Sequence, residues 1–202
     1  MLHVSTGPTY AVFDVETSGL SSRWHRILQI GVVVVDAEGT VIREWSSYVK
    51  PFLGHVGATH IHGLTRQGLR DAPSFKAIAS ELVATLNGST IVAHNIGFDW
   101  AFLRRALRRA GYRPPDPVRM CTLQMSRRLD PERQLRHRLI DVSGRYDVEL
   151  THAHDALSDA RATAGVLPRL IAATGGNAVT GFTEGSDLLW PTTPKRWWRR
   201  YV

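Results

Sequence analysis

YAVFDVETSGL, residues 10–20, decides the fold, because it joins an apolar strand to two carboxylates and a glycine turn. The β-branched and aromatic residues at its start predict a strand. Asp14 and Glu16 are two positions apart, so on a strand both side chains point to one face while Val15 points to the other. Ser18-Gly19 then predicts a turn where backbone approaches a ligand closely. The segment therefore brings two carboxylates together at the end of a rigid element.

Further β segments and amphipathic segments alternate along the chain. The β segments are residues 27–35, 40–49, 90–93 and 118–121, the last at an edge. Asp36-Ala-Glu-Gly39 predicts a hairpin turn between the first two. Apolar residues at helical spacing predict helices over 72–86, 97–110, 122–128, 135–146 and 154–173. This order predicts an α/β fold whose mixed sheet of five strands is flanked by helices.

The composition changes near residue 174, which predicts a domain over residues 1–173 and a tail over 174–202. Gly175-Gly176 begins a stretch with few apolar residues, which reads as a linker. The tail ends in the basic, tryptophan-rich sequence WPTTPKRWWRRYV. That end is compatible with nucleic-acid binding, with a membrane surface and with disorder, and the sequence leaves all three open.

Positive charge is concentrated in the middle of the chain. The net charge is +7, and residues 104–145 hold twelve arginines against four acids. Guanidinium groups present paired donors to phosphate oxygens, so the cluster favours a nucleic-acid partner. The alternative is a solvated helix face in an arginine-rich protein, because Arg outnumbers Lys by 22 to 3 throughout.

The cysteine count and hydropathy predict a soluble, cytoplasmic protein. Cys121 is the single cysteine, which excludes an intramolecular disulfide and zinc sites that need paired thiolates. The longest purely aliphatic run, Val32–Val35, is far shorter than the roughly 20 residues of a membrane helix, so no membrane span is expected. The N-terminus lacks the charged-then-apolar pattern of a signal peptide.

Two more acids stand at the starts of predicted helices. Asp99 follows His94-Asn95 at a strand-to-helix corner, and Asp159 opens the last helix. Helix capping is the simpler explanation for such an acid, as a wet strand face is for Asp14 and Glu16. Buried carboxylates without partners are costly, however, and divalent cations are natural partners for them.

His154 precedes Asp159 by five residues, which on a continuous helix would place it about 140° around the axis. It therefore fits best on a loop just outside the helix. A neutral imidazole near bound metal can take a proton from water near pH 7. His152 is a nearby rival for this role, and a cap or surface role is the common alternative for a lone histidine.

Three motifs in register resemble the DEDDh 3′-to-5′ exonucleases, the group that includes the proofreading subunit of the bacterial replicative polymerase, ribonuclease T and oligoribonuclease. They are FDVETSGL at 13–20, HNIGFD at 94–99 and HDALSDA at 154–160, within a resemblance that covers residues 10 to about 172. The resemblance implies a ribonuclease H-like fold, with two Mg²⁺ or Mn²⁺ ions held by Asp14, Glu16, Asp99 and Asp159. It implies His154 as the general base and nucleoside 5′-monophosphates as products.

The resemblance also implies a pocket for a single-stranded 3′ end. Its expected residues are Thr17, Gly19, Leu20, His62, Asn95 and Phe98. IHGLT at 61–65 is typical of the proofreading-like branch and favours DNA over RNA. The alternatives are an RNA exonuclease of the oligoribonuclease or ribonuclease T type and a catalytically inactive nucleic-acid-binding module.

A polymerase or sliding-clamp partner has weaker support in the sequence. The hydrophobic polymerase-binding segment expected in the tail is not recognisable. SDLLW at 186–190 faintly resembles a clamp-binding peptide, but it lacks the leading glutamine.

Overall fold

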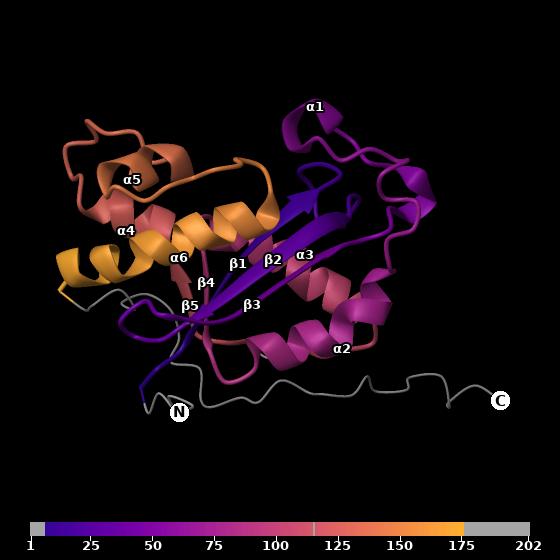
Figure 1. The fold of residues 1–202 in the computed structure, drawn as a ribbon, viewed down its shortest axis with the longest axis horizontal. Helices are drawn as coiled ribbons and strands as arrows, with labels where there is room; N and C mark the ends of the chain where they lie inside the picture. The colour runs from indigo at the N-terminus through magenta and orange to yellow at the C-terminus, as the bar shows by residue number, and fades with distance from the viewer. Residues whose placement is uncertain (1–6, 115, 176–202) are drawn as a thin grey trace.

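A computed structural model describes residues 7–114 and 116–175 and contains one mixed sheet (Figure 1). Its strands are β1 (Tyr10–Thr17), β2 (Ile27–Val35), β3 (Val41–Tyr48), β4 (Thr90–Ala93) and β5 (Arg119–Cys121). Their order is β3-β2-β1-β4-β5, so β1 is central and β5 lies at an edge. β1 pairs with β2 antiparallel and with β4 parallel. The predicted mixed sheet of five strands is confirmed.

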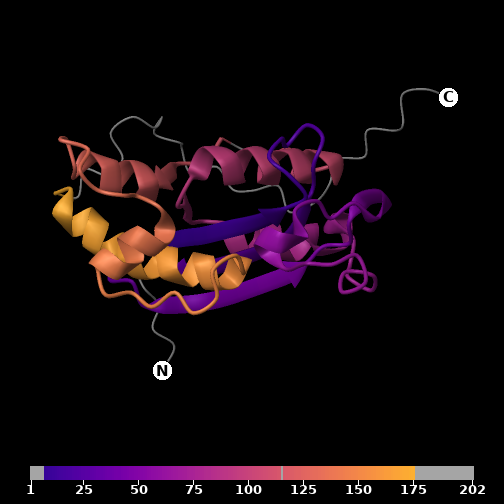
Figure 2. The same ribbon diagram turned by 90° about the horizontal axis from the view of Figure 1, so that it is seen from above.

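Helices cover both faces of this sheet (Figures 1 and 2). The helices of the described chain are α1 (Thr59–His62), α2 (Phe75–Leu86), α3 (Ile96–Arg109), α4 (Thr122–Arg128), α5 (Leu139–Arg145) and α6 (Ala156–Ala173). The short α1 lies beyond the end of β1 and not on a face of the sheet (Figure 1). A short 3-10 helix spans Phe52–Gly54. The sequence did not predict this turn or α1, because neither is long enough to show an apolar period. The tail from residue 176 lies outside the described residues.

Side-chain alternation along β1 divides the core into two parts. Ala11, Phe13 and Val15 pack in a cluster with residues of α2 and α3. Val12 packs in a second cluster with residues of α4, α5 and α6. Strand geometry places Asp14 and Glu16 on the face of Val12. The two acids of β1 therefore share the face that α6 covers.

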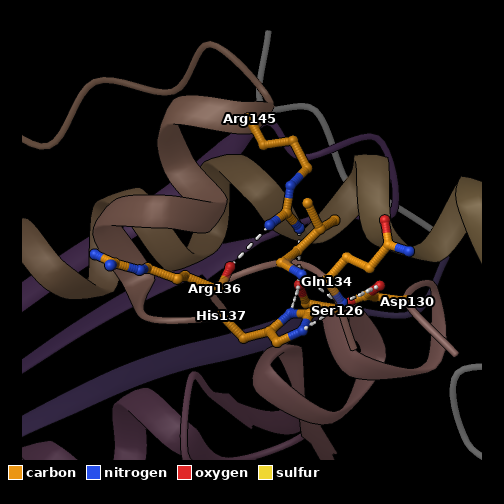
Figure 3. A network of polar contacts seen from close by, with 7 residues as sticks. Ser126, Asp130, Gln134, Arg136, His137 and Arg145 are labelled. Carbon is orange, nitrogen blue, oxygen red and sulfur yellow. Dashed lines mark hydrogen bonds and ion pairs between the residues drawn. The ribbon is translucent and has the colours of Figure 1, made fainter. Parts of the chain in front are cut away.

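The helix predicted over 135–146 is shorter in the structure, because Asp130 holds the chain before it in a loop (Figure 3). Its carboxylate accepts hydrogen bonds from the backbone N–H groups of Gln134 and Leu135. It also contacts His137 Nε2 at 3.1 Å, and His137 Nδ1 lies 2.9 Å from Ser126 Oγ. These local side-chain contacts compete with helix formation until Leu139.

No helix within residues 7–114 and 116–175 combines the length and apolar character needed to cross a membrane.

Candidate active site

Two carboxylates project from the last half of β1 toward the start of α6. In the β1–β2 ladder Asp14 is opposite Gly31, and Glu16 is opposite Gln29. The Glu16 side chain is largely buried, with 9% of its surface exposed. The central position of β1 holds both carboxylates on a rigid support.

The first turn of α6 brings Asp159 to this face. Asp155 caps the helix by accepting a hydrogen bond from Ser158 N at 3.0 Å. Gln29 on β2 donates to the other carboxylate oxygen of Asp155 at 2.7 Å. This contact ties the start of α6 to the strand beside Glu16, so the helix presents Asp159 to the strand acids.

His154 lies outside α6, as its spacing from Asp159 predicts. Its backbone has φ 67°, a left-handed conformation that histidine tolerates better than most residues. Its N–H donates to Asp159 Oδ2 at 3.2 Å, while the residue itself is exposed. The backbone is therefore held by Asp159 and the imidazole is open to solvent.

Glu16, His154 and Asp159 form a compact group of potential metal ligands. One ligand atom from each lies within 4.8 Å of the others. Asp14 is outside this group but close enough for Asp99, Asp159 and Glu16 to raise the pKa of its carboxyl, after burial as the larger cause. The structure thus brings residues from β1, α3 and α6 to one place.

Asp99 reaches the cluster from the first turn of α3 and is 4% exposed. Burial raises its pKa to about 7, and backbone hydrogen bonds from its own amide and that of Val15 oppose this shift. Just upstream, His94 contacts Thr122 Oγ1 at 3.0 Å and the carbonyl of His137 at 2.8 Å. His94 therefore supports the corner that carries Asp99, and both of its ring nitrogens are engaged there.

Electrostatic crowding makes the cluster a fit for divalent cations. Burial raises the pKa of Glu16 to about 8, with Asp159 and Asp99 as further causes. Burial also raises the pKa of Asp159, against the hydrogen bond from His154 N–H. Asp159 Oδ1 is buried and has no hydrogen-bond partner among the described residues. Oxygen donors of this kind are the ligands that Mg²⁺ and Mn²⁺ prefer.

The metal-free protein is expected to lose stability as pH rises from about 5 to about 8. Folding raises the pKa of Glu16 from 4.5 to about 8 and that of Asp99 from 3.8 to about 7, so the folded state binds more protons and rising pH favours unfolding. We expect the Tm in chelator to fall by several degrees, since 1 kcal/mol moves the Tm by roughly 2–4 °C at this size.

Saturating Mg²⁺ or Mn²⁺ is the control for this titration. Bound cations offset the repulsion between the carboxylates, so the Tm should then stay level or rise across the same pH range. A metal-free Tm that rises from about pH 5 to about pH 8 would contradict the assigned crowding.

Three of the predicted substrate-binding residues lie at the end of β1 and in the turn that follows it: Thr17 is the last residue of the strand, and Gly19 and Leu20 belong to the turn. Thr17 Oγ1 donates to the carbonyl of Gly19 at 2.8 Å and so shapes the turn. A Cβ on Gly19 would lie 2.5 Å from the His25 ring. The Leu20 side chain is 87% exposed. Thr17 and Gly19 build the turn, and Leu20 projects from it.

The other three predicted substrate-binding residues differ in environment. His62 is buried, and its ring contacts the carbonyl of Val56 at 3.1 Å and accepts from Leu64 N at 3.0 Å. Both ring nitrogens thus contact backbone, and its contact with substrate stays a prediction. Asn95 is exposed at the N-cap of α3. Phe98 is half-buried, and the centroid of its ring lies 4.9 Å from the centroid of the Phe102 ring.

Comparison with known proteins decides the family. A family model described as Exonuclease, RNase_T, matches residues 11–167. The chain belongs to this exonuclease family. Its sequence relatives and structural neighbours fit the DEDD 3′-to-5′ exonucleases, which confirms the predicted resemblance. The family depends on divalent metal ions, and the acidic cluster is the candidate site for them in this exonuclease.

Curated relatives of the exonuclease include DNA polymerase III PolC-type proteins. That of Bacillus cereus is 33% identical over 165 residues, which cover 81% of this chain and 11% of the relative. That of Staphylococcus aureus is 33% identical over 167 residues, with the same coverage. The exonuclease chain therefore spans about a tenth of the length of these relatives.

Solved structures share the fold of the exonuclease. Exonuclease X in complex with 5′ overhanging duplex DNA is 26% identical with a TM-score of 0.64, covering 84% of this chain and 95% of that one. Exonuclease I of E. coli in complex with a dT13 oligonucleotide is 22% identical with a TM-score of 0.73, covering 84% and 42%. The predicted ribonuclease H-like fold is confirmed.

Sequence reasoning missed three residues that position the exonuclease cluster. Gln29 and Gly31 interrupt an apolar run in β2, and Asp155 stands between His154 and the start of α6. A Cβ on Gly31 would lie 2.5 Å from the backbone of Ala156 and Leu157, so only glycine lets α6 approach the strand this closely. Gln29 and Gly31 could have been found from the sequence, because a polar residue and a glycine inside an otherwise apolar strand often mark a place where another part of the chain approaches closely.

Gly31→Ala is expected to lower the exonuclease rate about tenfold and to cost about 1–3 kcal/mol of stability. The added methyl group would push the start of α6, and with it Asp159, away from β1. Thermal unfolding and a nuclease assay measure the two effects. Gly144→Ala is the matched control, because a Cβ there has no neighbour within 4 Å in the described structure. Equal behaviour of the two variants would refute the close contact as a positioning device.

Proposed function

We propose that this chain is a metal-dependent exonuclease that removes nucleoside 5′-monophosphates from the 3′ end of single-stranded DNA. One observation carries the proposal: acids from β1, α3 and α6 crowd at the end of the sheet, next to the exposed His154. A protein that only bound nucleic acid would gain nothing from this repulsion. Its affinity would come from neutralising phosphates and would be insensitive to chelator.

Asp14, Glu16, Asp99 and Asp159 are the proposed metal ligands, for two Mg²⁺ or Mn²⁺ ions. Such ions supply positive charge for a phosphate and lower the pKa of water. The protein contributes the rigid placement of the ligands. Glu16 and Asp14 are fixed by the central strand, and Asp159 is fixed by the capped start of α6.

His154 is the proposed general base, which takes the proton from the attacking water. Its ring lies beside Glu16 and Asp159 and is open to solvent, so it can exchange the proton with water. The hydrogen bond from its backbone N–H to Asp159 holds the backbone of His154 next to the acids. The loop that carries His154 and the helix that carries Asp159 therefore place the proposed base and a proposed metal ligand side by side.

The terminal nucleotide is proposed to lie over the turn after β1. The exposed Leu20 offers an apolar surface for a base, and the half-buried Phe98 a second one. Thr17 and Gly19 hold the turn in place. Asn95, exposed beside Phe98, is a candidate for polar contact with the sugar or phosphate.

DNA is the proposed substrate, supported by the relatives named as DNA polymerases and by the Exonuclease X complex with DNA. A role in proofreading, repair or DNA processing follows from this choice. A polymerase partner is part of the proposal only through the PolC-type relatives, of which the chain covers 11%. The clamp-like peptide at 186–190 lies outside the described residues.

Product analysis on matched substrates tests the proposal. The protein is incubated with 3′-labelled single-stranded DNA and RNA of one sequence, in Mg²⁺ or Mn²⁺. We expect nucleoside monophosphates from DNA, with a slower rate on RNA and none in chelator. Faster release from RNA would support the oligoribonuclease-like alternative. No release from either substrate, with the protein folded and metal present, would refute the enzyme.

A further inference from the structure

A cavity of about 230 Å³ opens on the face of the sheet that α2 and α3 cover. Its apolar lining includes the side chains of Phe75 and Phe102. Four cations also line it: Arg26, Lys50, Lys76 and Arg109. It is smaller than the roughly 300–1,000 Å³ of pockets for drug-sized ligands, so it suits one planar ring system. An aromatic ring joined to an anion would match both its lining and its rim.

The positive charge at this cavity is uncompensated. Within residues 7–114 and 116–175, none of the four cations forms an ion pair. Arg26 and Arg109 instead donate hydrogen bonds to backbone carbonyls of the β1–β2 loop. Desolvation lowers the pKa of Arg109, and repulsion from Arg26 and Arg105 adds to this effect. An anion placed here would relieve the repulsion.

An exposed aromatic ring stands beside these cations. Phe52 lines the cavity and is 60% exposed, and the Arg26 guanidinium carbon lies 5.2 Å from the centroid of its ring. Stacking platforms of aromatic rings with nearby arginines are how proteins hold unpaired bases without reading their sequence. The cavity therefore offers the two contacts that a nucleotide needs, charge for its phosphate and a ring for its base.

A second basic cavity adjoins the first. It has a volume of about 630 Å³ and shares Lys50 with the first cavity. Arg66 and Arg70 are among its lining residues, and in the described part of the chain no carboxylate lines either cavity. Because the two cavities share Lys50, together they form a positive surface that is longer than a single nucleotide would need. Such a run of charge fits a chain of phosphates better than a single free nucleotide.

The first cavity begins close to the catalytic strand. Ile27 lines it, and in the sheet Ile27 is the partner of Thr17, the residue after Glu16. The carboxylates lie on the α6 face and the cavity on the α2 and α3 face, so the turn after β1 separates the two. A strand whose 3′ end lies at the carboxylates can reach the cavity by crossing this turn.

We propose that the two cavities bind single-stranded nucleic acid away from its 3′ end, with phosphates on the cations and a base against Phe52, Phe75 and Phe102. This inference rests on the proposed function, because it extends the same substrate strand beyond the terminal nucleotide. It makes affinity depend on strand length, since only a strand long enough to cross the turn reaches the cations.

Binding by Asp14→Asn protein in chelator tests this without catalysis. The probes are a thymidine dinucleotide and a labelled oligothymidylate of about 12 nucleotides, within the size range of single-strand sites. Adding Lys50→Gln and Lys76→Gln should weaken binding of the longer strand about tenfold and leave the dinucleotide unchanged. The slope of log K against log salt should shrink by about 1.4, or about 0.7 for each phosphate that the protein no longer neutralises.

Arg104→Gln with Arg108→Gln is the matched control, because it removes two charges from the exposed face of α3 without touching either cavity. Ala106→Leu, which fills the first cavity from its wall, should weaken the longer strand with an unchanged salt slope. An equal loss in the control pair would overturn the proposal. Equal losses for dinucleotide and longer strand would also overturn it, in favour of a site for free nucleotides.

The binding experiment and the nucleotide-release experiment can fail independently of each other. A protein that shows the length-dependent loss but releases no nucleotide supports the cavities and refutes the exonuclease. A protein that releases nucleotides normally but binds the longer strand equally with and without Lys50 and Lys76 refutes the cavities alone.

Discussion

Asp14→Asn is expected to lower the rate of nucleotide release by at least about 10³-fold. An amide of nearly the same shape replaces one of the four carboxylates of the proposed metal site. Metal ions contribute several kcal/mol to such reactions, and each 1.36 kcal/mol is a factor of ten in rate. Release of labelled mononucleotides under single-turnover conditions measures the loss.

The same substitution should leave the fold intact and make the metal-free protein as stable as the wild type or more so. Asp14 is repelled by Asp99, Asp159 and Glu16, so removing its charge relieves the cluster. Thermal unfolding in chelator measures this effect. An inactive variant with a much lower Tm would show unfolding, and full activity would overturn the assignment of Asp14 as a metal ligand.

His154→Asn is expected to lower the rate about 10²- to 10⁴-fold, the range of a lost general base. Asparagine is chosen because it tolerates the left-handed backbone at this position, where φ is 67°. The backbone hydrogen bond to Asp159 is kept, so the acids stay in place. The rate of mononucleotide release across pH, compared with wild type, is the measurement.

His152→Asn is the matched control for His154, since His152 is exposed two residues earlier in the same loop. We expect it to retain nearly full activity. The Mg²⁺-induced rise in Tm should persist in His154→Asn and be reduced in Asp14→Asn, which separates a proton acceptor from a metal ligand. A large loss from His152→Asn together with a small loss from His154→Asn would transfer the base role to His152.

The sequence predicted those elements whose signal is local. β2 has the predicted bounds, because its run of β-branched residues and the turn signal that follows it are both local features of the sequence. Residues 135–138 were wrongly included in a helix, because the Asp130 carboxylate binds the backbone there. In the sequence Asp130 is simply an acid before a proline, and nothing local shows that its carboxylate will bind the backbone four and five residues later.

The sequence predicted those parts of the candidate site for which the period of a strand or helix determines where a side chain points. Two residues of separation put Asp14 and Glu16 on one face, and helix starts brought Asp99 and Asp159 inward. The contact of Gln29 with Asp155 joins residues 126 positions apart, and no local rule couples them. His62 was assigned to the substrate pocket by resemblance, and its burial against the backbone of Val56 is a tertiary property.

The cluster joins strand β1, near the beginning of the described chain, to helix α6, near its end. Ribosomes make the chain from the N-terminus, so Asp14 and Glu16 exist long before Asp159 and His154. A nascent chain that has not yet formed α6 holds only part of the ligand set and lacks the proposed base. The proposed active site can therefore form only after α6 has been made and has packed on the sheet, even though its two strand ligands are among the first residues of the fold.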